Sequence, residues 1–229
     1  MYPEDLISRF KAPCFQDSYF LSFEGIEGSG KSTQMKQVEL HLKNKGHNVI
    51  LLREPGGTTF GEKLREAILQ SKRKLHPIAE AHLFASARAQ ILYEIILEKL
   101  KTPKTIVICD RYIDSSLAYQ GHAGKLGVKT VLEIHKDFPL TTVPNLTFYI
   151  RISLETSMER QRIRNNQKDY FESQGKQFHQ SLIDGYEEAS RIFPDRITVI
   201  DGEKTPENVT KMIIEKTNLL LEGKLKCPT

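Results

Sequence analysis

The sequence predicts an α/β fold of three layers, in which a five-stranded parallel sheet is flanked by helices on both faces. Short apolar segments alternate along the chain with longer segments of helical periodicity, an order that is typical of parallel sheets. Residues 105–109 form a continuous apolar run, as expected of a strand that is buried on both faces. A glycine-rich segment follows the first apolar segment and precedes a helical pattern, which indicates a sharp turn between strand and helix.

The elements of the first half of the chain follow from apolar spacing and from turn residues. Met35, Val38 and Leu42 recur at helical spacing, and the turn residues at 55–57 punctuate the chain after the second strand. Pro103 ends a long helix whose apolar residues lie on or near one face. The predicted strands are 19–23 and 48–52. The predicted helices are 31–45, about 60–70 and 78–101.

The second half continues this alternation. Thr205 caps the last helix, and Pro206 occupies its first position. The polar segment at 165–176 carries Gly175, and we expect a short mobile lid at about 160–176. The predicted strands are 105–109, 145–150 and 197–200. The predicted helices are about 114–121, 128–137, 153–164, about 177–192 and 206–221.

Length, charge and cysteine usage limit the class of protein. The 229 residues suit one domain, with residues 1–17 as an N-terminal extension that lacks the apolar segment of a secretory signal, and 18–229 as the main domain. A net charge of +4 is too small to indicate nucleic-acid binding, and no apolar run approaches the ~18 residues of a membrane span. Cys14, Cys109 and Cys227 are too widely spaced for a disulfide framework or a zinc site, and they favour a reducing, cytoplasmic location.

Residues 25–32 match the pattern G-x-x-x-x-G-K-[ST] of a phosphate-binding loop, or P-loop. Its glycines let backbone N–H groups point inward, and the following helix adds its positive N-terminal end. Lys31 would reach the outer phosphates of ATP or a similar nucleotide, and the Ser32 hydroxyl can ligate Mg²⁺. The residues expected to bind ATP in this segment are Gly25, Ile26, Glu27, Gly28, Ser29, Gly30, Lys31, Ser32 and Thr33.

Asp110 closes the apolar run at 105–109. Its carboxylate would lie at the carboxyl edge of the sheet, near the P-loop, where it could hold Mg²⁺ through water. A helix cap or a surface carboxylate is the alternative, but an apolar strand that ends in Asp-Arg favours the metal site. We therefore predict a metal site at Ser32 and Asp110.

Four short segments together resemble the signatures of bacterial thymidylate kinases. They are Gly-Ile-Glu-Gly at 25–28, Arg-Glu-Pro-Gly-Gly-Thr at 53–58, Asp-Arg-Tyr at 110–112 and Ser-Ser-Leu-Ala-Tyr-Gln-Gly at 115–121. The resemblance runs from about residue 19 to 221. It implies transfer of the γ-phosphoryl group of ATP to dTMP, giving dTDP and ADP for dTTP synthesis, with Mg²⁺ accompanying ATP. It also implies the nucleoside monophosphate kinase fold and a homodimer.

The resemblance implies roles in dTMP binding as well. Phe84 and Arg88 lie four apart on one predicted helix, where they would stack on thymine and bond a thymine carbonyl. Without the resemblance, core packing and a solvated helix face are the simpler interpretations of these two residues. Tyr119 would pack under the sugar and disfavour a 2′-hydroxyl, while Glu27 would contact the 3′-hydroxyl. The other implied dTMP-binding residues are Arg53, Arg111, Ser115 and Ser116.

Catalysis in such an enzyme needs positive charge rather than a strong base, because the acceptor is already a phosphate oxyanion. The P-loop carries no basic residue between Gly25 and Lys31. The resemblance then implies that the lid supplies one. We assign the catalytic roles to Lys31, Arg111 and Arg164.

The lid itself departs from the family pattern. Arg160, Arg162 and Arg164 alternate before the polar segment, and Arg160 or Arg162 would pack beside adenine or hold the lid. We assign Arg160 to ATP binding, although a solvated basic face is the commoner reason for such a run. The family often has Asp-Arg-Phe-Glu in the lid, whereas residues 169–172 read Asp-Tyr-Phe-Glu, so Tyr170 cannot supply that positive charge.

Three other interpretations remain open at this point. The interpretation as a switch GTPase is weakened because Asn-Gln-Lys-Asp at 166–169 has its lysine one position later than the guanine-binding motif Asn-Lys-x-Asp. In addition, no Asp-x-x-Gly occurs in the chain. Another nucleoside monophosphate or deoxynucleoside kinase would share the fold and most motifs. A non-catalytic nucleotide-binding module is disfavoured because Lys31, Ser32, Asp110 and Arg111 are all present.

Overall fold

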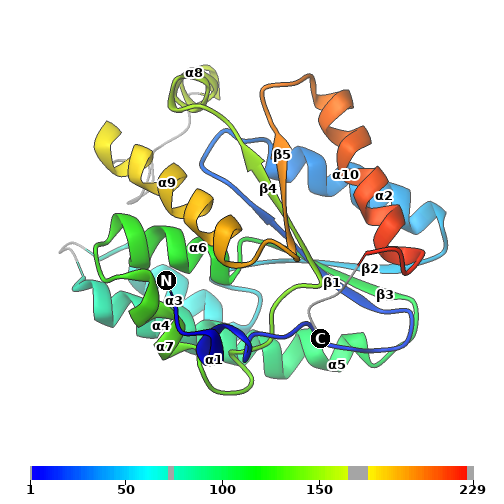
Figure 1. The fold of residues 1–229 in the computed structure, drawn as a ribbon, viewed down its shortest axis with the longest axis horizontal. Coiled ribbons are helices and arrows are strands. Elements are labelled where there is room, and N and C mark those ends of the chain that lie inside the picture. Colours follow the sequence, from blue (N-terminus) through cyan, green and yellow to red (C-terminus); the bar gives the residue numbers. More distant parts are fainter. Residues whose placement is uncertain (1, 72–74, 165–174, 226–229) are drawn as a thin grey trace.

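The structure is a computed structural model that describes residues 2–71, 75–164 and 175–225, apart from the side chain of Arg164. Five parallel strands form one sheet in the order β2-β3-β1-β4-β5 (Figure 1). The strands are β1 (Tyr19–Glu24), β2 (Asn48–Arg53), β3 (Thr105–Asp110), β4 (Leu146–Arg151) and β5 (Ile197–Asp201). The predicted fold class is confirmed, and each predicted strand begins and ends within one residue of the observed one.

Helices cover both faces of the sheet, and the alternation of side chains along the strands explains the two cores. In β3, Ile106 and Ile108 pack in the core beneath α2 (Lys31–Asn44) and α10 (Pro206–Leu221). Val107 and Cys109 point to the opposite core. All four side chains are fully buried. The continuous apolar run of β3 is therefore needed to fill both layers.

Most of the remaining helices cover the opposite core (Figure 1). The helix predicted at 78–101 is one helical stretch that changes type, from α4 to the π-helical η1 and back to α5. The helix predicted at about 114–121 is likewise α6 followed by the π-helical η2. The helical elements between β2 and β5 in the chain are α3 (Thr59–Leu69), α4 (Pro77–Ile91), η1 (Leu92–Ile96), α5 (Leu97–Leu100), α6 (Ile113–Ser116), η2 (Leu117–Ala123), α7 (Val128–Ile134), α8 (Leu154–Arg164) and α9 (Lys176–Ile192).

The helix predicted at 128–137 ends earlier, because α7 stops at Ile134. His135 follows it, and Phe138 precedes Pro139, a position at which helical backbone is disfavoured. The side chain of His135 turns back toward Val131 in the last turn of the helix, and its Nδ1 lies 2.8 Å from that carbonyl oxygen. This early end places His135 in the interior of the protein.

The N-terminal extension packs against the main domain. It contains α1 (Glu4–Ile7), and Leu6 and Phe10 are each 4% exposed within the larger core. The ring of Phe10 contacts that of Phe193, at the end of α9, with 5.8 Å between centroids. Lys11 then pairs with the segment that leads into β4, through a bond from its N–H to the Thr141 carbonyl. The extension therefore contributes directly to the hydrophobic core.

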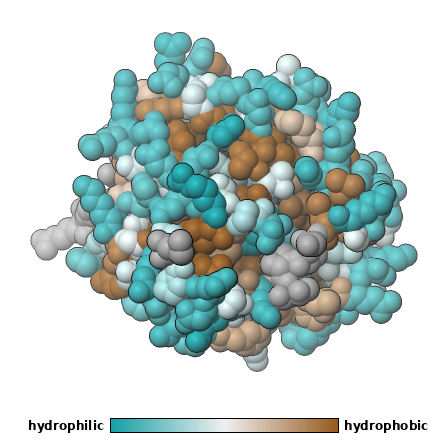
Figure 2. All heavy atoms as spheres, viewed as in Figure 1, coloured by the Kyte–Doolittle hydropathy of each residue, from teal (hydrophilic) through white to brown (hydrophobic). Residues whose placement is uncertain are grey.

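Hydrophilic side chains cover much of the face in Figure 2, with hydrophobic side chains showing between them. Tyr93 and Phe138 are among the most exposed large apolar side chains. Within the described ranges, no helix is both long and apolar enough to cross a membrane.

Candidate active site

The P-loop connects β1 to α2 and is shaped by glycines in the left-handed region. Gly25, Gly28 and Gly30 have φ values of 138°, 80° and 95°. A Cβ atom at Gly25 would lie 2.6 Å from the carbonyl oxygen of Ile150, so a side chain does not fit there. Gly30 precedes α2 without a side-chain cap on its N-terminus. Backbone N–H groups at this helix end are thus available to an anionic phosphate.

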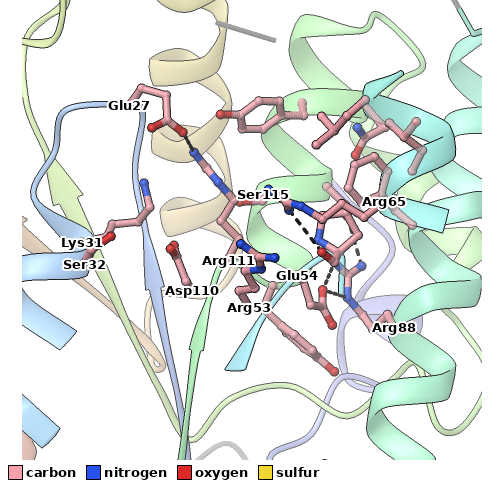
Figure 3. A pocket seen from close by; sticks show the side chains of 18 of the residues that line it. Glu27, Lys31, Ser32, Arg53, Glu54, Arg65, Arg88, Asp110, Arg111 and Ser115 are labelled. Carbon is pink, nitrogen blue, oxygen red and sulfur yellow. Dashed lines mark hydrogen bonds and ion pairs between the residues drawn. The ribbon is translucent and has the colours of Figure 1, made fainter. Parts of the chain in front are cut away.

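Lys31 lies across this loop rather than in solvent (Figure 3). Its Nζ donates to the carbonyl oxygen of Gly25 at 2.9 Å and to that of Ile26 at 3.5 Å. Burial and the positive charge of Arg111 lower the pKa of Lys31. The loop carbonyls therefore hold the ammonium group beside the place where phosphates would lie.

The residues expected to hold Mg²⁺ fit that ion. Ser32 and Asp110 both line the same cavity, at the start of α2 and at the end of β3. Oδ1 of Asp110 is buried and has no hydrogen-bond partner among the described residues. A hydroxyl and a carboxylate are hard oxygen ligands, and Mg²⁺ commonly takes only one or two protein ligands in addition to phosphates and water. No cluster of three or more His, Cys, Asp or Glu side chains in the described part of the chain offers a different metal site.

A cavity of about 270 Å³ opens between the P-loop and α4. Figure 3 shows Glu27 and Lys31 near one end and Arg88 near the other. The predicted residues that line it are Glu27, Gly28, Gly30, Lys31, Ser32, Arg53, Phe84, Arg88, Asp110, Arg111, Ser115, Ser116 and Tyr119. The P-loop and the residues expected to bind the acceptor thus share one space.

Some predicted residues lie beside this cavity instead of lining it. Ile26 and Ser29 are buried within the P-loop, and Thr33 is exposed on the first turn of α2. Arg160 donates from Nη1 to the carbonyl oxygen of Gly28 and from Nη2 to that of Gly202, each at 3.1 Å. Arg160 therefore ties α8 to the P-loop. The side chain of Arg164 and lid residues 165–174, including Tyr170, lie outside the described residues.

Arg111 has a backbone φ of 68°, which is unusual for a residue with a side chain. Its Nη1 donates to the carbonyl oxygen of Gly25 at 3.2 Å and to the Tyr186 hydroxyl at 2.9 Å, while its Nη2 pairs with Glu27. The guanidinium also lies 5.1 Å from the ring centre of Tyr119. Burial disfavours its charge, but Tyr119, Tyr186 and Glu27 outweigh burial and raise the pKa of Arg111 above its ordinary value. The site therefore holds a fixed positive charge beside the P-loop.

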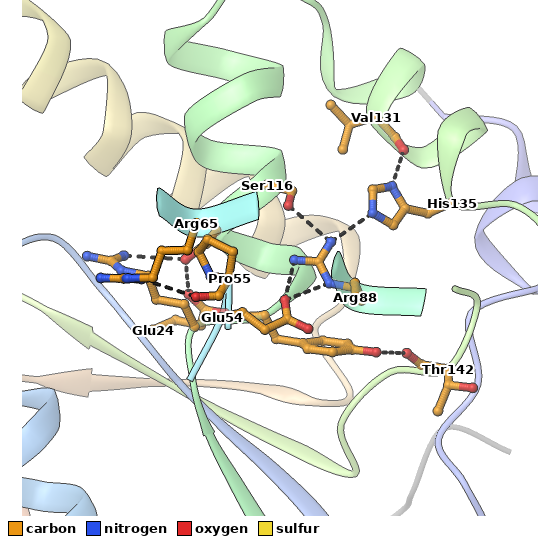
Figure 4. A network of polar contacts seen from close by, with 12 residues as sticks. Glu24, Glu54, Pro55, Arg65, Arg88, Ser116, Val131, His135 and Thr142 are labelled. Carbon is orange, nitrogen blue, oxygen red and sulfur yellow. Dashed lines mark hydrogen bonds and ion pairs between the residues drawn. The ribbon is translucent and has the colours of Figure 1, made fainter. Parts of the chain in front are cut away.

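Arg88 lies within a buried polar network (Figure 4). Its Nε donates to Oε2 of Glu54 at 2.8 Å, and its Nη2 forms an ion pair with the same oxygen at 2.6 Å. Its Nη1 contacts Oγ of Ser116 at 3.1 Å and Nε2 of His135 at 2.7 Å. The side chain is only 1% exposed, which excludes the simpler interpretation that Arg88 lies on a solvated helix face. The ring of Tyr112 lies under it, with the ring centre 4.9 Å from the guanidinium carbon.

Three further residues predicted to bind the acceptor line the same cavity. Arg53 lies at the cavity edge and is paired with Glu62 at 3.4 Å, with both side chains about half exposed. Tyr119 packs against Phe178 of α9, with 6.3 Å between ring centroids. Phe84 lines the cavity from α4, on the same helix as Arg88. Their placement is compatible with contact to a nucleotide.

Sequence reasoning missed several residues of the site. Glu54 and Gln120 both line the cavity, and both lie inside motifs that the resemblance already quoted. Tyr186 and His135 gave no signal, because each lies in a helical pattern that is equally typical of a core residue. Glu24 accepts hydrogen bonds from the Tyr112 N–H and from the hydroxyl of Ser115, each at 2.7 Å. Burial, followed by the charge of Asp114, raises the pKa of Glu24 to about 8.

A P-loop that opens α2, a carboxylate at the end of the neighbouring strand and a cavity lined by arginines define a nucleotide-binding phosphotransferase of the P-loop class. Residues 23–213 match the family model described as thymidylate kinase. Since this match covers most of the chain, the protein belongs to the thymidylate kinase family.

Curated relatives agree with this assignment. The thymidylate kinase of Caldanaerobacter subterraneus subsp. tengcongensis is 39% identical over 204 residues, which are 89% of this chain and 97% of the relative. That of Thermosipho africanus is 41% identical over 201 residues, covering 86% and 98%. That of Geobacillus sp. is 39% identical over 207 residues, covering 90% and 98%. The alternatives of a switch GTPase and of a non-catalytic module find no support in these matches.

Proposed function

We propose that this chain transfers the γ-phosphoryl group of ATP to dTMP, giving dTDP and ADP. The observation that carries the proposal is the shared cavity. It is lined by Glu27, Lys31 and Ser32 of the P-loop and by Phe84 and Arg88 of α4. The P-loop end suits the donor phosphates, and the end at Arg88 suits a base. Family membership favours thymidylate as the acceptor.

The chain's own residues would act by positioning and by neutralising charge. Lys31 would exchange its loop carbonyl partners for the outer phosphate oxygens of ATP. Arg111, held by Tyr186 and Glu27, would face the acceptor phosphate with a fixed guanidinium. Ser32 and Asp110 would hold Mg²⁺, which would supply positive charge at the donor phosphates when bound.

The test is an acceptor comparison with purified protein, Mg²⁺ and ATP. ADP should form faster with dTMP than with dUMP, dCMP, dGMP or AMP. Faster turnover of any other acceptor would overturn the thymidylate assignment. We further propose that the protein acts in the cytoplasm as a homodimer. Sedimentation equilibrium of the purified protein tests the homodimer, because it measures the mass of the species in solution.

Arg164 is proposed as the lid residue that contacts the transferring phosphate, since the P-loop carries no basic residue between Gly25 and Lys31. Arg164→Ala should lower kcat strongly and leave dTMP affinity almost unchanged. Arg191→Ala, which removes an exposed arginine from α9, is the matched control. Unchanged turnover in R164A would show that the catalytic charge lies elsewhere.

A further inference from the structure

His135 lies at the end of α7 and is fully buried. Its Nδ1 is 2.8 Å from the carbonyl oxygen of Val131, and its Nε2 is 2.7 Å from Nη1 of Arg88. A carbonyl oxygen can only accept a hydrogen bond, and a guanidinium can only donate. Nδ1 must therefore carry the ring proton, and the lone pair of Nε2 must accept from Arg88. Both partners require the same neutral tautomer.

This contact completes the set of protein acceptors around Arg88. A guanidinium has five N–H donors. The Nε donor is directed to Glu54, Nη2 forms an ion pair with the same carboxylate oxygen, and the two donors on Nη1 are directed to Ser116 and His135. Among the described residues, one N–H of Nη2 is left for a ligand. Because Arg88 also lines the cavity, it can present a single, fixed donor there.

The position of Arg88 indicates which part of the acceptor it reads. Arg88 and the P-loop lie at opposite ends of the cavity (Figure 3). An acceptor whose phosphate points to the P-loop would place the far edge of its base near Arg88. In thymine that edge carries the 4-carbonyl oxygen, which accepts a hydrogen bond, whereas cytosine carries an amino group that donates.

We propose that His135 is a positioning residue for base recognition, which holds Arg88 so that one N–H meets the 4-carbonyl oxygen of the acceptor base. This inference rests on the proposed thymidylate kinase function and adds a specificity-determining residue to it. His135 itself does not line the cavity and acts only through Arg88.

The surroundings of His135 keep it in the required state. Burial and the positive charge of Arg88 lower its pKa to about 3, so the ring is neutral near pH 7. Its Nδ1–H also donates to the carbonyl oxygen of Val131 in the last turn of α7. The ring is thus fixed at both nitrogens, and Arg88 is fixed through it.

Two substitutions separate this role from general stability. His135→Leu removes the acceptor, so the KM for dTMP should rise about tenfold while kcat and the KM for ATP change less than about twofold. The preference for dTMP over dCMP, as the ratio of kcat/KM values, should fall by a similar factor. His135→Asn keeps a side-chain oxygen that can accept, and it should restore most of both values. Unchanged dTMP KM and selectivity in H135L would overturn the proposal.

An acceptor analogue tests the route through Arg88. In a dTMP analogue without the 4-carbonyl oxygen, the penalty of H135L on KM should disappear, since the bond that His135 supports is then missing. An equal penalty with dTMP and with the analogue would show a merely structural role. Failure of the proposed function is seen separately, because the wild-type protein would then not phosphorylate dTMP.

A measurement on the unaltered protein covers the case in which H135L does not fold. Nitrogen-15 NMR of the histidine-labelled wild-type chain should show His135 as the neutral tautomer with its proton on Nδ1. Addition of dTMP should shift the Nε2 resonance without changing the tautomer. A proton on Nε2, or no response to dTMP, would overturn the inference.

Discussion

The hydroxyl of Tyr186 lies 2.9 Å from Nη1 of Arg111 and 2.8 Å from Oγ of Ser115. Tyr186 belongs to α9, which begins at Lys176, at the end of the segment predicted as the lid. Arg111 follows β3 and contacts the P-loop carbonyl of Gly25. A side chain of α9 is therefore bonded directly to the arginine that we expect to face the acceptor phosphate.

Tyr186→Phe should lower kcat about three- to tenfold, because one hydrogen bond to Arg111 is lost while the ring keeps its packing against Tyr149. The KM for ATP should remain close to the wild-type value. Steady-state kinetics with both substrates measure these constants. Tyr93→Phe, which alters a side chain that is 74% exposed, is the control. Equal kinetics for wild type and Y186F would show that Arg111 is held sufficiently by Glu27 and Gly25.

Asp110→Asn should raise the Mg²⁺ concentration needed for half-maximal activity by about tenfold or more. The carboxylate oxygen Oδ1 is buried without a partner in the described part of the chain, and an amide there is a weaker ligand without charge. Mg²⁺ titration of initial rates measures the effect, after chelation has abolished the wild-type activity. Asp137→Asn, at an exposed position, is the control. An unchanged Mg²⁺ dependence would remove Asp110 from the metal site.

The strands could be predicted from sequence because their signal is local. A run such as 105–109 must fill two cores, and every residue of it reports that burial. The P-loop could also be predicted from sequence, since its signal is local: within a few residues, its glycines adopt positive φ values that other residues disfavour. The types of the helices could not be predicted in the same way, because the π-helical turns of η1 and η2 are a rare geometry inserted within helical segments.

The contacts that organise the site are long-range, and for that reason the sequence did not reveal them. Arg111 and Tyr186 are 75 residues apart, and Arg88 and His135 are 47 residues apart. A buried tyrosine or histidine in an amphipathic helix has the same pattern as a core residue. The resemblance supplied Arg88 by its position on the predicted helix and Arg111 through the Asp-Arg-Tyr motif, whereas only the fold identified the groups that hold them.

The stability of the protein should depend on His135 in acid. Its pKa is about 6.5 when unfolded and about 3 when folded, where burial and then the charges of Arg88 and His82 from α4 oppose its charge. Between these values the unfolded chain binds a proton that the folded chain does not, so this contribution is complete above pH 6.5 and falls as the pH drops toward 3. At pH 5 the expected loss is roughly 2 kcal/mol relative to neutral pH.

Urea unfolding of wild type and His135→Asn at pH 7 and pH 5 measures this contribution. Between pH 7 and pH 5, the free energy of unfolding should fall for both proteins, but by about 2 kcal/mol less for the variant than for wild type. His76→Asn is the control, since His76 is exposed and caps α4, a position that asparagine also fills well. The same pH dependence in wild type and H135N would mean that His135 titrates normally.

The N-terminal extension should prove to be part of the folded domain. Phe10 is 4% exposed and contacts Phe193 at the end of α9, so Phe10→Ala would leave a cavity between the extension and that helix. The expected loss is about 3 kcal/mol in the free energy of unfolding, measured by urea denaturation. Phe138→Ala removes the same side chain at a site that is 77% exposed, and it should change stability by less than about 0.5 kcal/mol. If both variants unfold at the wild-type midpoint, the extension does not stabilise the core. If only F10A is destabilised, residues 2–17 belong to the structure that holds α9, and hence Tyr186, against the active site.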